Sequence, residues 1–295
     1  MIFKKLFSKP LEFRTEKLSV KGRRDQNEDN CLAVKLDKGV YFLAVADGMG
    51  GMSGGNIASK IVLSAIEEYL RNDIKKSGNN EKLKDILSKA FLIGQTRVAD
   101  YIRINSKFRG MGTTLTAVLI QDRRYAWANI GDSRIYLLSN WQMKLITEDH
   151  SYIQDYIKNF KKEIPETIIS QYKNIVTKVI DGGLDKPDIY PENGDSENLK
   201  EGDLFLLCSD GLIIDKVKDY SGLFFDFFDH KKALKKIARN LVDWALYNGS
   251  EDNVSVVLGK YGSIKKGEID TPLINQTDDD LQTVRILTTK ESTSD

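Results

Sequence analysis

Short apolar runs and helical periodicities follow one another along the chain in an order that predicts a layered α+β domain. Strand-like runs stand within 15–37 and 113–146 and at 41–46, 204–208 and 254–258. Apolar residues recur at intervals of three and four, which predicts amphipathic helices, over 57–70, 83–102 and 233–246. Because strands and helices come in separate runs, the pattern favours an α+β fold over a doubly wound parallel sheet.

The segment between the second and third predicted helices begins with four short apolar runs separated by turn residues. They cover 113–120, 125–130, 134–138 and 142–146. Strands this short and this closely spaced predict an antiparallel meander. The chain is more polar after these runs. We expect one or two short helices and a polar loop at 151–173, and a loop over 185–203.

Changes in composition divide the chain into three parts. Residues 15–262 carry nearly all of the periodic apolar positions, so we expect them to form one domain. Residues 1–14 precede it as an N-terminal extension. Residues 263–295 follow as a polar tail containing three consecutive aspartates. We expect this tail to be flexible, because it has few apolar side chains to bury.

Composition excludes several classes of protein. A hydrophobic content of 41% and a charged content of 29% are typical of a soluble globular protein. The 44 basic and 43 acidic side chains nearly cancel, which argues against a nucleic-acid binder. No apolar run approaches the roughly 20 residues of a membrane span. Lysines interrupt the apolar stretch at 1–10, so we expect no secretory signal and a cytoplasmic protein with free, buried Cys31 and Cys208.

Two of the apolar runs end in the same way, in an aspartate followed by a glycine. The run 41–46 leads into Asp47 and Gly48, and the run at 204–209 leads into Asp210 and a second glycine. A carboxylate at the tip of a buried strand is held at the rim of a rigid core, and the glycine lets the backbone turn sharply. Two such tips side by side would form a site for a hard divalent cation, which prefers clustered oxygen ligands.

Further acidic residues stand beside glycines or at the ends of predicted strands. They are Glu28, Asp29, Asp132 and Asp252. Each alone is typical of a turn, and Gly131-Asp132-Ser133 alone would be a hairpin turn. The interpretation therefore depends on several of them acting together. Because all these ligands offer oxygen and none offers thiolate or imidazole, the set favours magnesium or manganese over zinc or copper.

Seven short stretches, in order along the chain, resemble the metal-dependent serine/threonine phosphatases of the protein phosphatase 2C (PPM) family, in the form found in bacteria. The stretches are 22–29, 46–51, 112–114, 131–134, 147–151, 208–212 and 249–253. Together they cover roughly residues 16–260. The resemblance implies a four-layer α/β/β/α sandwich, in which two antiparallel sheets are flanked by helix pairs. It also implies a binuclear metal centre at one edge of the sandwich.

The resemblance further implies a role for each acidic residue at that edge. Asp47 would bridge two Mg²⁺ or Mn²⁺ ions, and Asp210 and Asp252 would complete the first metal site. Glu28 and the carbonyl of Gly48 would serve the second site, largely through water. In this family, a water activated by the two metals attacks phosphorus, so the protein supplies no nucleophile of its own.

Three more positions are interpreted by the same resemblance. Asp29 would orient a metal-bound water, and Asp132, together with a carboxylate of the first site, would hold a third metal in bacterial relatives. Arg24 would bind the substrate phosphate, for which a guanidinium fork is well suited. Two positions depart from patterns in the family. Met49 stands where some members have a histidine proposed as general acid, and Lys178 replaces a usual arginine.

The function implied is hydrolysis of phosphoserine and phosphothreonine in proteins, in opposition to a serine/threonine kinase. Residues 152–172 match in position a mobile flap of bacterial relatives, which we expect to select phosphoproteins. A catalytically silent regulatory or binding module is an alternative from another class, and a phosphatase for small phosphate esters is a third. The presence of Asp47, Asp210 and Asp252 favours an enzyme, because silent relatives usually lose a metal carboxylate. We expect a monomer.

Overall fold

The computed structural model describes residues 11–50, 54–77, 82–160, 164–192, 196–214, 219–228 and 233–263. The chain divides into two units, Met1–Ser263 and Ile264–Asp295. The predicted tail beyond Ser263 and the first ten residues lie outside the described residues.

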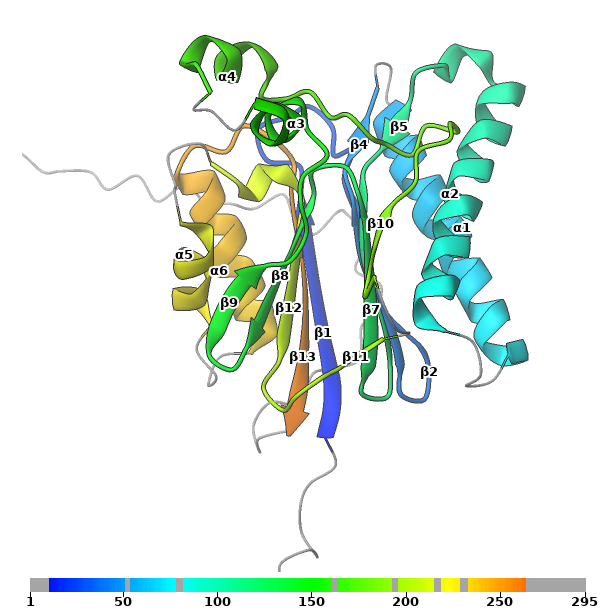
Figure 1. Cartoon of the computed structure of the whole chain (residues 1–295), viewed down its shortest axis with the longest axis vertical. Helices are drawn as coiled ribbons and strands as arrows, with labels where there is room; N and C mark the ends of the chain where they lie inside the picture. The colour runs from blue at the N-terminus through cyan, green and yellow to red at the C-terminus, as the bar shows by residue number, and fades with distance from the viewer. Residues whose placement is uncertain are drawn as a thin grey trace, which may run out of the picture. The chain divides into compact units, whose positions relative to one another are not determined.

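Two antiparallel sheets form the centre of the first unit (Figure 1). The five-stranded sheet has the order β1 (Leu11–Val20), β13 (Val254–Ser263), β12 (Leu204–Cys208), β8 (Arg134–Ser139) and β9 (Gln142–Leu145). The six-stranded sheet has the order β10 (Asp188–Tyr190), β7 (Arg124–Ile130), β6 (Leu115–Gln121), β3 (Val40–Ala46) and β2 (Asn30–Asp37), with β11 (Glu197–Asn198) also paired to β7. A small third sheet joins β4 (Gly48–Met49) to β5 (Gly112–Thr113).

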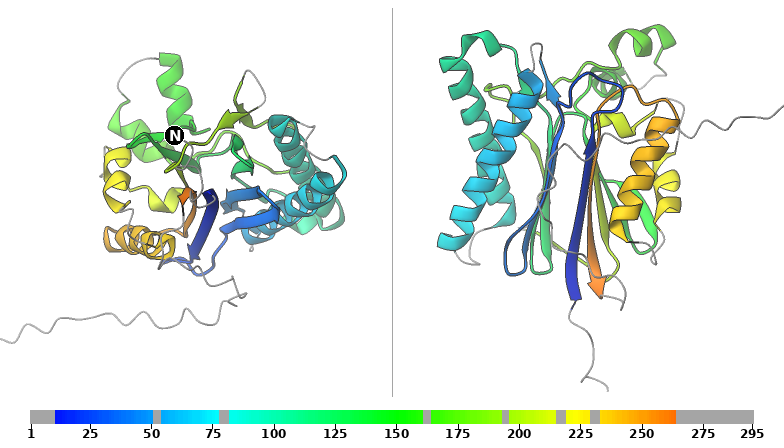
Figure 2. Two further views of the ribbon diagram at one scale, coloured as in Figure 1. Left: turned by 90° about the horizontal axis from the view of Figure 1, so that it is seen from below. Right: turned by 180° about the vertical axis from the view of Figure 1, so that it is seen from behind.

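Helix pairs cover the outer faces of the two large sheets (Figure 2). The long helices α1 (Gly54–Ser77) and α2 (Leu83–Ile104) cover the six-stranded sheet, and α5 (Tyr220–Phe227) and α6 (Leu234–Tyr247) cover the five-stranded one. The α/β/β/α layering implied by the resemblance is therefore confirmed. Two short helices, α3 (Tyr152–Phe160) and α4 (Glu166–Tyr172), lie at one end of the sandwich. None of the described helices is both long enough and apolar enough to cross a bilayer.

The central strands are apolar on both faces because each lies between two cores. In β3, Leu43 and Val45 face the core between the sheets, whereas Phe42 and Ala44 pack under α1 and α2. Successive side chains of a strand point to opposite faces, so burial on both sides requires a continuous apolar run. This requirement explains the run at 41–46 and fixes the strand rigidly up to its last residue.

The strand β12 repeats this arrangement in the five-stranded sheet. Phe205 and Leu207 face the core between the sheets, and Leu206 and Cys208 pack toward α5 and α6. Cys208 and Cys31 are both free and buried, as the sequence predicts. Asp47 directly follows β3 and Asp210 stands two residues after β12, so both are carried by strands that are covered on both faces.

The predicted meander is wrong at one connection. The strands β6 and β7 pair with each other, as do β8 and β9, but β7 and β8 belong to different sheets. Residues 131–133 are therefore a crossover between sheets and not a hairpin turn. Local apolar spacing is the same for strands that pair and strands that separate, so the pattern does not distinguish them.

Three other expectations differ from the structure. The strand β1 begins at Leu11, so residues 11–14, which were assigned to the N-terminal extension, pair with 260–263 in the sheet. The expected loop over 185–203 contains β10 and β11, which are too short to give a periodic signal. The helix α5 was not predicted: its buried Tyr220 and Phe224 are four residues apart, but the segment is only 8 residues long and neighbouring apolar residues obscure this period.

Candidate metal centre

Strand register brings two of the predicted acidic residues together in the six-stranded sheet. Asn30 at the start of β2 pairs with Ala46 at the end of β3. Asp29 and Asp47 adjoin these two residues in the sequence. They therefore lie at the same end of the sheet, beside each other.

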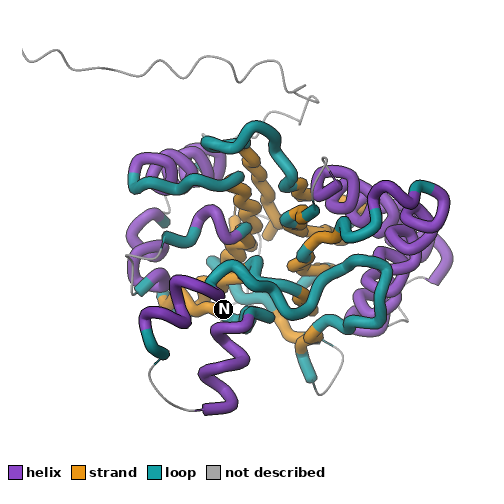
Figure 3. Tube along the Cα trace, turned by 90° about the horizontal axis from the view of Figure 1, so that it is seen from above, coloured by secondary structure: helices purple, strands orange, loops and turns teal. Residues whose placement is uncertain are grey.

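Strand pairing in the five-stranded sheet places three more carboxylates at one end of that sheet. Cys208, at the end of β12, pairs with Arg134 on β8 and with Val256 on β13. The aspartates that adjoin these strand ends therefore share one end of the sheet: Asp132, Asp210 and Asp252. Because the crossover 131–133 joins the two sheets here, both groups of carboxylates meet at a single end of the sandwich, which Figure 3 views from above.

The carboxylates are close enough to change one another's protonation. The pKa of Asp47 lies well above its usual range, because the side chain is buried and because Asp29, Asp210 and Asp132 surround it with negative charge. A hydrogen bond shared by the two side chains further raises the pKa of Asp47 and lowers that of Asp210, so these two carboxyl groups lie next to each other. Burial, followed by the charge of Asp252, raises the pKa of Asp210 as well.

Asp29 and Asp132 show the same effect. Burial is the main cause that raises the pKa of each side chain to about 7, and the charge of Asp210 contributes to both shifts. The hydrogen bond from the Ser209 hydroxyl opposes the shift at Asp29. The end of the sandwich is therefore a place where negative charge is concentrated and poorly solvated, and a bound cation would relieve it.

Two oxygens of this group have nothing to bind within the described part of the chain. Asp29 Oδ1 and Asp210 Oδ1 are buried and accept no hydrogen bond there. A buried carboxylate oxygen left unsatisfied is costly, because it has lost its water and gained no partner. Such orphaned acceptors are expected where a cation, or water held by a cation, completes the site.

The site fits cations that keep much of their water. Among the described residues, no three carboxylate, imidazole or thiol groups stand together as a ready cage for one ion. Mg²⁺ is usually held by one or two carboxylates and retains several waters, so it requires no such cage. Half-buried Asp47, Asp210 and Asp252 leave room for those waters. The donors are all oxygen, which suits Mg²⁺ or Mn²⁺.

Gly48 allows the backbone at the tip of β3 to pack more tightly than any side chain would permit. A Cβ atom at this position would lie 2.2 Å from the Gly55 carbonyl oxygen and 2.6 Å from the Glu28 carbonyl oxygen. The tip of β3, the first turn of α1 and the segment before β2 therefore touch through their backbones. The half-buried side chain of Glu28 belongs to the same edge.

Thr114 connects the two sheets at this end. Its hydroxyl accepts a hydrogen bond from the Asp47 amide at 3.0 Å and lies 2.9 Å from the hydroxyl of Ser133. Its own amide donates to the Asp47 carbonyl. Gly131 has a φ of +105°, and a Cβ there would lie 2.5 Å from Thr114. This contact couples the position of Asp47 to the crossover that carries Asp132.

Arg24 lies at the open rim of the acidic group. Its Nη2 donates to Asp252 Oδ2 at 2.6 Å, and 59% of its side chain is exposed. The loop that carries Arg24 is fixed by Asn253, whose amide donates to the carbonyls of Lys21 and Gln26 at 2.8 Å each. Asn253 also accepts from the Glu28 amide, so one buried side chain positions this entire loop.

The base of α3 is joined to the crossover by His150. Nδ1 of its buried ring accepts from the Gly131 amide at 3.1 Å, so Nε2 carries the proton and faces Asp188 at 3.2 Å. Lys178 Nζ lies 3.5 Å from the same aspartate. The lysine that replaces the family's usual arginine therefore keeps an ionic partner. His150 therefore holds a structural position.

A half-buried ion pair supports the crossover. Arg134 holds Asp149 through both carboxylate oxygens, with Nη2 at 2.6 Å and Nε at 2.9 Å. Burial would lower the pKa of Arg134, but the bond and charge of Asp149 outweigh it and raise the pKa. The sequence analysis quoted both residues within motifs and assigned a role to neither.

Sequence reasoning missed several residues that hold the site together. They are Thr114, Ser133, Arg134, Asp149, Ser209 and Asn253. All lie within the quoted motif stretches, one to three positions from an acidic residue or on the facing strand. Their position in the motifs was the available signal, but only the structure shows which groups they contact.

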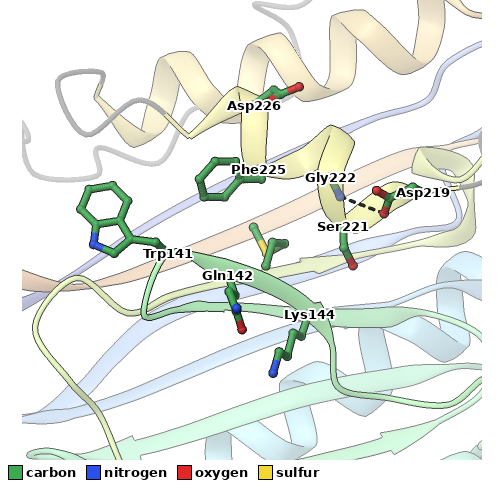
Figure 4. Close-up of a pocket in the computed structure, with 9 residues that line it drawn as sticks. Trp141, Gln142, Lys144, Asp219, Ser221, Gly222, Phe225 and Asp226 are labelled. Carbon is green, nitrogen blue, oxygen red and sulfur yellow. Dashed lines mark hydrogen bonds between the residues drawn. The ribbon is translucent and has the colours of Figure 1, made fainter.

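A separate cavity of about 620 Å³ lies between β9 and α5 (Figure 4). Trp141 and Phe225 border it, together with Lys144 and Asp226. None of the predicted site residues lines this cavity. We therefore assign the chemistry to the acidic end of the sandwich, where buried charge and orphaned oxygens occur together.

Comparison with known proteins agrees with this geometry. The sequence profile of the family described as Protein phosphatase 2C matches residues 20–245, which is more than three quarters of the chain. The chain is similar to the serine/threonine protein phosphatase PstP of Mycobacterium tuberculosis, with 32% identity over 243 residues. This match covers 80% of the chain but only 42% of that relative, so the chain spans less than half of its length.

Two further comparisons extend over whole relatives. The serine/threonine phosphatase stp of Listeria welshimeri is 28% identical over 258 residues, covering 87% of the chain and 97% of that protein. The crystal structure of the PstP catalytic domain in complex with two manganese ions matches with a TM-score of 0.72 and 30% identity. It covers 86% of the chain and all of that structure.

We predict that Mn²⁺ raises the melting temperature of this protein. Binding at 100 times the dissociation constant would contribute about 2.7 kcal/mol, or roughly 5–10 °C for a domain of this size. Differential scanning fluorimetry with excess Mn²⁺ or EDTA measures the shift. Asp47→Asn should lose most of it, whereas Asp243→Asn, an exposed carboxylate on α6, should keep it. Equal shifts in both variants would place the ion elsewhere.

Proposed function

The chain belongs to the protein phosphatase 2C family, and on that premise we propose that it hydrolyses phosphoserine and phosphothreonine in proteins with bound magnesium or manganese. The observation that carries the proposal is the convergence of Asp47, Asp210 and Asp252 at one end of the sandwich, where their charges shift one another's pKa values. Family membership gives the reaction class, and this convergence supplies the chemistry in this particular chain.

The acidic residues would hold two cations. We assign Asp47 to both of them, Asp210 and Asp252 to the first, and Glu28 with the Gly48 carbonyl to the second. When bound, such a pair of ions activates a water and neutralises the charge that develops on the phosphoryl group. The orphaned oxygen of Asp210 and the raised pKa of Asp47 support this assignment, because both reflect carboxylates that lack a counter-charge.

Asp29 and Asp132 complete the proposed site. Asp29 is 4% exposed and presents one free oxygen, so it is suited to accept a hydrogen bond from a water in the site. Burial, and then the negative charge of Asp210, raises the pKa of Asp132, so the two carboxylates interact. We assign both residues to a third cation when one is bound. Both assignments come from the family resemblance, and the concentrated negative charge at this end of the sandwich supports them.

Arg24 would bind the phosphate of the substrate. Its guanidinium is exposed at the rim, and its pKa is raised chiefly by the hydrogen bond and charge of Asp252, with Asp210 and Asp47 contributing. A cation on Asp252 would compete with this ion pair and leave the planar fork free for phosphate oxygens. The position therefore links cation binding to substrate binding.

We assign no side chain as the general acid that protonates the leaving alkoxide. Met49 occupies the position at which some family members have a histidine. His150 has both ring nitrogens engaged, by Gly131 and Asp188, so it is committed to the base of α3. Within the described residues, no other imidazole is present to donate a proton.

The second candidate is a catalytically silent module that only binds phosphoproteins. The intact acidic group favours the enzyme, since a purely binding domain has no need for carboxylates that destabilise one another. We also propose phosphorylated protein substrates opposed by a serine/threonine kinase, a cytoplasmic location and a monomeric state. The free thiols of Cys31 and Cys208 are compatible with a reducing compartment.

The function is tested by release of phosphate from a phosphothreonine peptide. We expect turnover with Mn²⁺ and none after EDTA, and we expect Asp47→Asn to lose at least about a thousandfold in kcat, because one ligand of both ions loses its charge. Asp243→Asn is the control and should match the wild type. Full binding of the peptide without turnover would favour the silent module instead.

Arg24 should act mainly on substrate affinity. Charge-assisted hydrogen bonds are worth about 1.5–3 kcal/mol, so Arg24→Ala should raise KM for the peptide by about 10- to 150-fold. Steady-state kinetics measure this change. Arg23→Ala removes an exposed guanidinium from the adjacent position and should leave KM within twofold. Similar effects of the two variants would mean that general positive charge, and not a specific contact, attracts the phosphate.

The flap at 152–172 is built to contact large substrates. Tyr152 stacks on Tyr172 with ring centroids 4.6 Å apart, which joins α3 to the end of α4. Glu148 holds α3 through Lys158 at 3.0 Å. Apolar Phe160, at 58% exposure, remains uncovered. An apolar surface beside the acidic end is suited to a protein chain and not to a small ester.

Removing the flap should therefore affect substrates unequally. Deletion of residues 155–170 should reduce kcat/KM for a phosphoprotein far more than for a small aryl phosphate. The double variant Ile157→Ser/Phe160→Ser changes only exposed side chains and should show the same preference more weakly. Parallel losses on both substrates would contradict a role in selection.

A further inference from the structure

We propose that Ser209 is a positioning residue, which fixes the buried Asp29 carboxylate so that one oxygen points into the site as a free acceptor. The inference rests on the proposed function, because its consequence is for the cations and the water that Asp29 would serve. It concerns a residue that precedes Asp210 and touches no substrate.

The hydroxyl of Ser209 can donate in only one direction. Its oxygen accepts a hydrogen bond from the Ser255 amide at 3.0 Å, and an amide cannot reverse its role. The single hydroxyl proton is therefore directed to the other close partner, Asp29 Oδ2, at 2.7 Å. Ser209 is fully buried, so within the protein no water competes for either bond.

The consequence for Asp29 is a difference between its two oxygens. Oδ2 is satisfied by Ser209, while Oδ1 is buried and accepts no hydrogen bond from the described residues. A carboxylate fixed at one oxygen has its rotamer set, so the free oxygen is presented in a constant direction. Residues that do not bind a metal but orient the groups around it are typically important: their substitution lowers metal affinity or activity by about 10–100-fold.

The backbone supports the same arrangement from the other side. The Asp29 amide donates to Asn27 Oδ1 at 3.3 Å, and Asn27 Nδ2 donates to the Ser19 hydroxyl at 2.9 Å. Ser255 Oγ donates to the same Ser19 at 2.7 Å. Ser19 therefore belongs to the network of hydroxyls that supports the Asp29 backbone, and exposed Ser64 on α1 serves as the control for the loss of a hydroxyl group.

A double-mutant cycle tests the inference. Ser209→Ala should lower kcat on an aryl phosphate by about 10–100-fold with KM within twofold, because Arg24 is untouched. It should also weaken Mn²⁺ binding in calorimetry. In an Asp29→Asn background, the same Ser209→Ala change should alter kcat and Mn²⁺ affinity by less than about twofold, since residues acting through one another are not additive.

The controls separate this inference from the proposed function. Ser64→Ala removes an exposed hydroxyl on α1 and should keep wild-type kinetics. Ser209→Cys, which avoids a cavity but donates weakly, should behave like Ser209→Ala. Equal losses of kcat in both backgrounds, or a fully active Ser209→Ala protein, would overturn the inference. The proposed function would still stand in that case if Asp47→Asn abolished phosphate release. If the wild type releases no phosphate, the proposed function fails. The Mn²⁺ calorimetry alone then decides the positioning role.

Discussion

Mutual repulsion among buried carboxylates is the constraint that the rest of this structure accommodates. Five aspartates from both sheets meet at one end of the sandwich, and burial raises the pKa of four of them. Such a cluster opposes folding unless the surrounding chain holds it firmly. The two apolar strands β3 and β12, each covered on both faces, supply that rigidity and carry Asp47 and Asp210 directly at their tips.

A layer of uncharged hydrogen bonds transmits this rigidity to the other carboxylates. Thr114 ties the backbone of Asp47 to the crossover, Asn253 fixes the loop before β2, and Ser209 orients Asp29. None of these residues would bind a cation under our proposal. They determine where the carboxylates point, and a site for hydrated cations depends on such orientation because few direct ligands are available for each ion.

The sequence predicts a large part of this arrangement. The continuous runs before Asp47 and Asp210 indicate central strands, because only burial on both faces requires unbroken apolar residues. The resemblance in motif order implies the four layers and the acidic set. The sequence does not reveal that residues 131–133 pass between sheets, because strand pairing depends on long-range packing. It also does not reveal α5, a short helix in which the four-residue spacing of buried Tyr220 and Phe224 is obscured by neighbouring apolar residues.

The central claim is that Asp47 is shared by two cations at the point where the sheets meet. Anomalous diffraction from crystals grown with Mn²⁺ measures the positions of the ions without reference to activity. We predict two strong peaks at this end of the sandwich, both within direct ligand distance of the Asp47 carboxylate and one beside Asp210. Ions bound elsewhere on the protein, with no peak next to Asp47, would contradict the account.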